Sequence, residues 1–202
     1  MTQLQKHLEN IADGLSQNGY AVVDSFLNQE ECEAIRSHRW LAGPIAELQR
    51  AGIGKDNRQV NESVRGDFIR WIDPNDADPP LAVYLNRLIQ LRQFLNENLF
   101  LSLKDQEIHV ARYPAGAFYK RHLDQFRRDG HRRISVICYL NPEWMPDHGG
   151  QLRMYTDQGE QDVLPTEGRL ACFRSDMIEH EVLPATRERA SVTGWLLDEL
   201  RH

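Results

Sequence analysis

The chain has 202 residues, of which 41% are hydrophobic and 27% charged, and its formal net charge is -6 at pH 7. This composition excludes a disordered chain, and the acidic balance argues against nucleic acid as the main partner. No apolar run is long enough for a signal peptide or a membrane span, so we expect a cytoplasmic protein without a membrane partner. The three cysteines are widely spaced, match no zinc motif and indicate reduced thiols (Cys32, Cys138 and Cys172).

One domain is expected over residues 1–202, with residues 1–100 mainly helical. The predicted elements are an amphipathic helix over 2–17, a strand over 20–27, a helix from the Asn28 cap to 37, a helical stretch after 43, a polar loop over 54–67, a strand in FIRWI and a helix over 81–99. The long helix begins behind a Pro-Pro pair, which suits a helix start.

Beyond residue 101 the pattern changes to short strands separated by turns. The predicted strands are EIHVARY, FYKRHLD, RISVICYLN, GGQLRMYT, QDVLP, GRLACFR, HEVLP and RASVTGWLLDE. Eight short strands in one run predict an α+β fold with a mostly β core, a double-sheet jelly roll over residues 101–200 that the N-terminal helices support. We expect the chemistry to lie in this half.

A candidate metal site begins with His122 and Asp124, which are two apart in a predicted strand and therefore point to the same face. His180, on a strand expected across the sandwich, is a candidate third ligand. Two histidines and one carboxylate leave three positions open on an octahedral metal, as in non-haem iron(II) oxygenases. An HxD pair is weak evidence alone, because a surface histidine beside a hydrogen-bonding aspartate gives the same pattern.

The other six histidines are assigned mostly to the solvated surface (His7, His38, His109, His131, His148 and His202). His109 is the exception, a candidate for a buried histidine with its hydrogen bonds satisfied.

Arg189 lies two residues before Ser191 on the last predicted strand and shares its face. A guanidinium presents a planar fork to a carboxylate, so Arg189 suits a dicarboxylate co-substrate. A zinc hydrolase has no such need. The alternative for Arg189 is an exposed salt bridge within the charged run ATRERA.

The segments YPAGAFYKRHLD, ISVICYLN, GGQLRMY and HEVLPATRERASVTGW resemble the prolyl hydroxylase branch of the 2-oxoglutarate oxygenases. The similarity, over residues 65–198, is to the type that hydroxylates the hypoxia-inducible factor in animals and to its bacterial relatives. It implies a double-stranded β-helix, or jelly roll, in agreement with the strand count. It also implies iron(II) held by His122, Asp124 and His180, 2-oxoglutarate and dioxygen as co-substrates, and ascorbate as a candidate reductant.

The resemblance assigns further residues by position. Arg189 and Tyr139 would bind the distal carboxylate of 2-oxoglutarate, and Tyr113 would lie at its metal-proximal end. Leu152 would line this pocket, and Ser191 would add a hydroxyl. Ordinary core packing is the alternative for the aromatic and apolar members.

The implied reaction is hydroxylation of a prolyl residue in a protein, with release of succinate and carbon dioxide. Residues 54–71 would form a substrate loop, and the implied substrate contacts are Arg65, Asp67, Trp71, Tyr119, Arg132 and Trp195. The bacterial relatives suggest elongation factor Tu as a candidate partner. Two alternatives stay open, a metal-dependent hydrolase on the same ligands and a non-catalytic jelly-roll interaction module.

Overall fold

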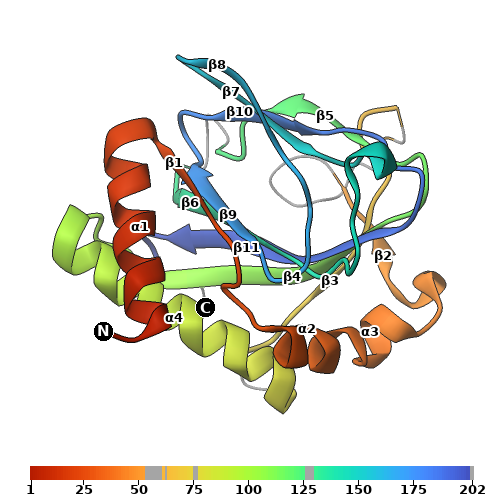
Figure 1. Cartoon of the computed structure of the whole chain (residues 1–202), viewed down its shortest axis with the longest axis horizontal. Coiled ribbons are helices and arrows are strands. Elements are labelled where there is room, and N and C mark those ends of the chain that lie inside the picture. Colours follow the sequence, from red (N-terminus) through yellow and green to blue (C-terminus); the bar gives the residue numbers. More distant parts are fainter. Residues whose placement is uncertain (53–60, 62, 75–76, 126–129, 201–202) are drawn as a thin grey trace.

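Two antiparallel sheets face each other, and helices cover the outer side of the larger one (Figure 1). The structure, a computed structural model, describes residues 1–52, 61, 63–74, 77–125 and 130–200. Its helices are α1 (Gln3–Asn18), α2 (Gln29–Arg36), α3 (Arg39–Ala42) and α4 (Pro79–Leu99), with 3-10 turns η1 (Ile45–Glu47) and η2 (Pro146–His148). Its strands are β1 (Tyr20–Val23), β2 (Gln49–Arg50), β3 (Phe68–Trp71), β4 (Asp105–Tyr113), β5 (Tyr119–His122), β6 (Arg132–Tyr139), β7 (Leu152–Thr156), β8 (Gly159–Val163), β9 (Leu170–Arg174), β10 (Glu179–Val182) and β11 (Arg189–Leu197).

The strand order confirms the predicted jelly roll with a mostly β core. The larger sheet has the order β1-β9-β6-β11-β4-β3-β2, and the smaller one β5-β10-β7-β8. Each of the eight strands predicted after residue 101 is present, with ends shifted by a few residues. Neighbours in the sheets are distant in sequence, as β1 beside β9 shows, so long-range pairing decides the architecture.

Apolar side chains form two clusters, one on each face of the larger sheet. The first joins the inner faces of α1 and α4 to the sheet, and α1 contributes Leu8, Ile11 and Leu15 at spacings of three and four. The second fills the space between the two sheets, where Phe173 and Met154 are fully buried. The helices therefore support the larger sheet from outside and leave its other face for the site. Within the described residues, no helix is long and apolar enough to cross a membrane.

The capping signals are confirmed, and several boundaries move. Asn28 caps α2 through its side chain, which accepts from the backbone N–H of Glu31, and α1 ends at Gly19 with a φ of 77°. The strand predicted over 20–27 stops at residue 23, because Ser25 adopts a positive φ of 55°. The helical stretch expected after residue 43 is only the 3-10 turn η1.

His7 lies on the inner side of α1, beside the apolar stripe, so its expected place at the solvated surface is wrong. His7 is 5% exposed, and its ring lies 6.0 Å from that of Phe26. Its Nε2 is 2.9 Å from the side-chain amide nitrogen of Gln3. In the expected substrate loop over 54–71, residues 54–60 and 62 lie outside the described residues.

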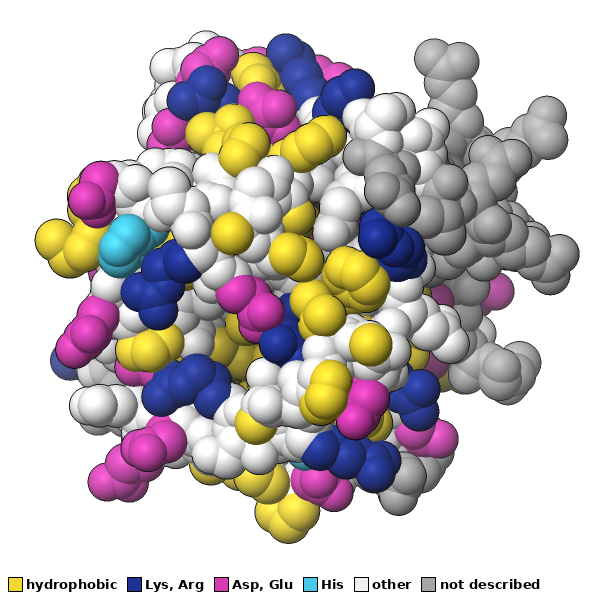
Figure 2. All heavy atoms as spheres, turned by 90° about the vertical axis from the view of Figure 1, so that its right-hand side faces the viewer, with side chains coloured by type: hydrophobic (Ala, Val, Ile, Leu, Met, Phe, Trp, Pro, Cys, Tyr) yellow, Lys and Arg dark blue, Asp and Glu magenta, His cyan; other side chains and the backbone are white. Residues whose placement is uncertain are grey.

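Charged side chains of both signs mix on one face of the molecule. Among the described residues in Figure 2, dark-blue and magenta side chains alternate with hydrophobic ones across the view. Such mixing keeps the local field weak, since neighbouring charges of opposite sign cancel.

Gly194 is required by the close pairing of β11 with β4. It lies between Val136 of β6 and Ile108 of β4, and an added Cβ would overlap the carbonyl oxygen of Glu107. Gly194→Ala should therefore lower the free energy of unfolding by about 1–3 kcal/mol, the usual effect of overpacking, and lower the melting temperature. Thermal unfolding checks this against Gly130→Ala, where the nearest atom would lie 3.9 Å away. Equal melting temperatures would contradict it.

Candidate functional site

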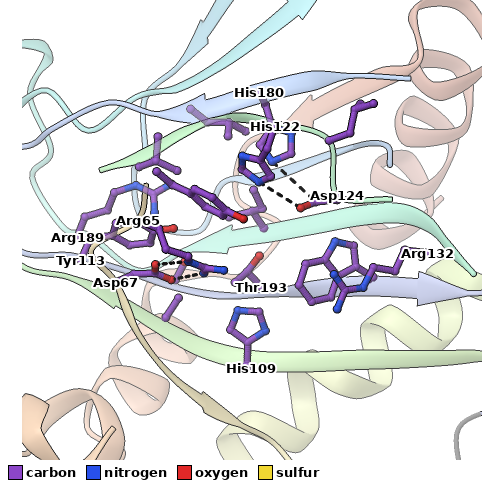
Figure 3. Close-up of a pocket in the computed structure, with 18 of the residues that line it drawn as sticks. Arg65, Asp67, His109, Tyr113, His122, Asp124, Arg132, His180, Arg189 and Thr193 are labelled. Atoms are coloured by element: carbon purple, nitrogen blue, oxygen red, sulfur yellow. Dashed lines mark hydrogen bonds and ion pairs between the residues drawn. The ribbon is translucent and has the colours of Figure 1, made fainter. Parts of the chain in front are cut away.

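A pocket between the two sheets collects the residues singled out in the sequence. All of the predicted metal, co-substrate and substrate residues line it except Tyr139 and Trp71. Figure 3 shows the labelled side chains converging from β4, β5, β6, β10 and β11 and from the segment before β3, with the predicted ligands on one wall.

The three predicted metal ligands come together at one wall of this pocket. His122 and His180 are direct partners in the register of β5 with β10. The Nε2 atom of His122 is 3.4 Å from one Asp124 oxygen, and that of His180 is 3.6 Å from the other. One ligand atom from each residue lies within 4.8 Å of the others, a spacing suited to a single ion.

The position of His180 differs from the prediction. It was expected across the sandwich, but β10 is the neighbour of β5 in the same small sheet, so that expectation is wrong. Asp124 also lies beyond β5, which ends at His122. Its carboxylate instead reaches the facing sheet, where it accepts a hydrogen bond of 2.6 Å from the Ser135 hydroxyl on β6. The metal wall is therefore tied to both sheets.

Backbone carbonyls orient both imidazole rings. The Nδ1 atom of His122 lies 2.7 Å from the carbonyl oxygen of Lys120, and that of His180 lies 3.2 Å from that of Ile178. A carbonyl can only accept, so each Nδ1 carries a proton and donates it, which leaves Nε2 as the nitrogen that faces the cluster. This is the orientation that a metal-binding histidine needs.

Burial and the neighbouring groups determine the charge of the cluster. Burial lowers the pKa of His180 to about 4, so this ring is neutral at pH 7. Burial opposes ionisation of Asp124, but His180, His122 and the Ser135 hydroxyl outweigh it and hold the pKa of the carboxyl well below its usual range. Two imidazoles and one carboxylate form the donor set of the iron(II) facial triad.

Arg189, at one end of the pocket, and the neighbouring Tyr139 each carry a buried polar atom without a partner among the described residues. Arg189 is 2% exposed; its Nε donates to the carbonyl oxygen of Gly150 at 3.1 Å, but its Nη2 has no partner among the described residues. The Tyr139 hydroxyl is also buried and has no partner in the same part of the chain, while its ring lies 4.9 Å from the guanidinium carbon. Burial raises the pKa of Tyr139, so the phenol stays protonated. Two unpaired donors beside each other fit a carboxylate.

This geometry also decides between the two interpretations of Arg189. Arg189 is buried, which excludes an exposed salt bridge. Among the described residues, no carboxylate pairs with its guanidinium. Tyr113 faces it in the register of β4 with β11, and its ring lies 5.1 Å from the guanidinium carbon. Leu152 and Ser191 line the same pocket and are buried.

A chain of contacts connects the predicted substrate residues to the metal wall. Arg65 and Asp67 form a two-pronged ion pair with distances of 2.7 and 2.6 Å. The guanidinium carbon of Arg65 lies 4.2 Å from the ring centre of Tyr119, and Tyr119 stacks on His122 with centroids 3.6 Å apart. These side chains form one continuous side of the pocket.

One indole lines the end of the pocket away from Arg189, and a second lies behind this wall. Arg132 covers Trp195 at 3.5 Å, and both line the pocket. Trp71 does not line it; the side chain packs edge-on against the ring of His109, with centroids 4.7 Å apart, and is 37% exposed. Trp71 thus supports the wall from behind.

Sequence reasoning missed His109 and Ser135 as members of this site. His109 is buried as expected, but its Nδ1 has no hydrogen-bond partner in the described chain, so the expectation of a satisfied histidine is wrong. It lies four residues before Tyr113 on β4, and Ser135 lies four before Tyr139 on β6. Even spacing on a strand was the available signal, because it places both side chains on the pocket face.

Residues 108–197 match the sequence profile of the 2OG-Fe(II) oxygenase superfamily. The chain is 31% identical to the hypoxia-inducible factor prolyl hydroxylase of Caenorhabditis elegans, over 95% of this chain and 28% of that protein. It is 29% identical to Egl nine homolog 1 of Homo sapiens, over 96% of this chain and 47% of that protein. The chain thus spans less than half the length of these two relatives.

Two solved structures are similar over nearly their whole length. A prolyl-4-hydroxylase of Pseudomonas putida is 44% identical, with a TM-score of 0.86 over 94% of this chain and 98% of that one. A prolyl hydroxylase of Trichoplax adhaerens, in complex with a peptide fragment of the hypoxia inducible factor oxygen degradation domain, is 29% identical, with a TM-score of 0.84 over 97% and 91%.

The hydrogen bond from Ser135 to Asp124 generates a prediction about metal binding. Ser135→Ala should weaken the binding of a divalent ion by roughly tenfold or more, because groups that orient ligand side chains typically contribute that much. Titration with cobalt(II), followed by visible absorption, measures the affinity. Ser37→Ala, an exposed serine at the end of α2, is the control and should bind cobalt(II) like the wild type. Unchanged affinity in Ser135→Ala would show that the carboxylate needs no support from β6.

Proposed function

This chain belongs to the 2OG-Fe(II) oxygenase superfamily, and on that basis we propose that it hydroxylates a prolyl residue in a protein substrate and releases succinate and carbon dioxide. The superfamily implies iron(II), 2-oxoglutarate and dioxygen. The observation that carries the proposal is one pocket that holds both the His-Asp-His cluster and a buried arginine with an unpaired nitrogen. A hydrolase or a binding module built on the same sheets leaves that arginine unexplained.

In this proposal His122, Asp124 and His180 hold iron(II). Two neutral imidazoles and one carboxylate would fill one side of the ion and leave the other side for ligands. Iron with 2-oxoglutarate and dioxygen supplies the oxidising chemistry when bound. The chain itself orients the ligands through the carbonyls behind each ring and the Ser135 hydroxyl, and it keeps the site buried between the sheets.

Arg189 and Tyr139 would bind the distal carboxylate of 2-oxoglutarate through their unpaired donors. Tyr113, Leu152 and Ser191 would line the co-substrate between that carboxylate and the metal. The position of Tyr113 opposite Arg189 on the neighbouring strand supports this arrangement.

The prolyl substrate rests on the likeness to prolyl hydroxylases and on the shape of the outer pocket. Tyr119, Trp195 and the plane of Arg132 would enclose the pyrrolidine ring, since flat aromatic walls suit a rigid apolar group. Arg65 and Asp67 would support Tyr119 and contact the substrate backbone.

We propose elongation factor Tu as the protein partner. We also propose that residues 1–202 form one oxygenase domain.

Replacement of Arg189 tests the co-substrate site. Arg189→Ala should raise the concentration of 2-oxoglutarate needed for half-maximal turnover at least tenfold, because a hydrogen bond to a charged group contributes about 1.5–3 kcal/mol. Tyr139→Phe should have a smaller effect, since it removes a neutral donor. Succinate release measures both. Arg169→Ala, whose side chain bonds Asp24 outside the pocket, is the control. Normal dependence on 2-oxoglutarate in Arg189→Ala would place the anion-binding charge elsewhere.

Mass spectrometry of substrate proteins tests the reaction itself. Purified elongation factor Tu and a mixture of cytosolic proteins are incubated with the enzyme, iron(II) and 2-oxoglutarate in air. We expect one added oxygen atom on a proline, absent when 2-oxoglutarate is omitted and absent with His122→Ala, which removes a proposed ligand. Oxidation confined to other residue types would contradict the prolyl substrate. Turnover that proceeds without 2-oxoglutarate would favour the hydrolase.

A further inference from the structure

A second pair of unpaired polar atoms lies in the pocket, near the end away from Arg189. The Nδ1 atom of His109 and the Nε1 atom of Trp195 are both buried, and neither has a hydrogen-bond partner among the described residues. Both side chains line the pocket, and His109 is only 4% exposed. A buried polar atom without a partner costs about 1–3 kcal/mol, so two of them at one end of a pocket indicate a ligand that pairs with them.

The surrounding strands and rings fix His109 in place. In the sheet it pairs with Trp71 of β3 on one side and with Thr193 of β11 on the other. Its ring lies between two indoles, 4.7 Å from that of Trp71 and 5.6 Å from that of Trp195. Figure 3 shows His109 rising from β4 toward the pocket, on the wall opposite His122 and His180. The imidazole therefore faces the space that a substrate would occupy.

The hydrogen-bonding groups around His109 are mainly donors. Arg65, Arg132 and the Trp195 N–H all line this part of the pocket, and burial, with the two arginines, lowers the pKa of His109 to about 3. The ring is thus neutral and keeps a lone pair. The two carboxylates that line the pocket are engaged, Asp67 with Arg65 and Asp124 with Ser135. His109 consequently offers an uncharged acceptor among donors.

We propose that His109 accepts a hydrogen bond from the backbone N–H of the residue that follows the target proline, while the Trp195 N–H donates to a backbone carbonyl of the same substrate chain. This inference rests on the proposed prolyl substrate. The proline nitrogen inside a chain carries no hydrogen, so the N–H nearest to the ring on the carboxyl side belongs to the next residue. Free proline has no such group. His109 thereby selects proline within a polypeptide over the free amino acid.

Backbone substitution in the substrate tests this contact. The probes are a blocked pentapeptide with a central proline and its analogue in which the amide after proline is an ester, which replaces the N–H by oxygen. Calorimetric titration under nitrogen, with iron(II) and 2-oxoglutarate present, measures binding without turnover. The wild type should bind the amide about tenfold more tightly than the ester, which corresponds to ~1.4 kcal/mol. His109→Leu should bind the two probes equally, and His109→Gln, which keeps an acceptor, should restore part of the preference.

A second buried histidine supplies the matched control. His7 is 5% exposed, lies on α1 outside the pocket, and His7→Leu should keep the full preference for the amide. A tenfold preference that persists in His109→Leu would overturn the proposal, as would a wild type that binds the probes equally or binds neither. Hydroxyproline formed from the amide probe in air reports on the proposed function separately. Its absence would reject the reaction, whereas its presence without an amide preference would reject only the role of His109.

Discussion

The pairing of β5 with β10 is the interaction on which the site depends. It places His122 directly opposite His180, so one register of two short strands brings two imidazoles to the same point. A shift by one residue would turn one of the rings to the opposite face of the sheet. Asp124 then completes the cluster from beyond the strand end, where the facing sheet holds it through Ser135. The metal wall exists only when both sheets are paired and packed.

The larger sheet provides the other wall because its strands have two different faces. On β11, Val192 and Leu196 point into the apolar cluster with the helices, while Arg189, Thr193 and Trp195 line the pocket. The helices α1 and α4 cover the first face, which removes apolar surface from water and leaves the second face free to be polar. Polar residues inside the sandwich either line this pocket, as Arg189 and Thr193 do, or hydrogen-bond one another, as Ser135 does with Asp124.

Several of these polar atoms have no partner within the described chain, and their distribution is informative. Arg189 and Trp195 lie six residues apart on β11, about 20 Å of strand, while Tyr139 of β6 pairs with Ser191 and His109 of β4 pairs with Thr193 between them. The folded chain carries the energetic cost of both sets, which ligands would relieve. The pocket thus has two polar ends, with the His-Asp-His cluster on the wall that faces them.

Local periodicity and side-chain chemistry were enough to predict the eight strands after residue 101, the Asn28 cap, the types of ligand and the shared face of Arg189 and Ser191 on the last strand. These local signals identified His122, Asp124, His180 and Arg189 as candidates for one site. Strand pairing in the folded chain places His180 beside β5 and not across the sandwich, brings Ser135 to Asp124, and leaves the His109 Nδ1 without a partner among the described residues. These depend on which strands become neighbours and in what register. Strand pairing joins residues far apart in the chain, so no local pattern specifies it.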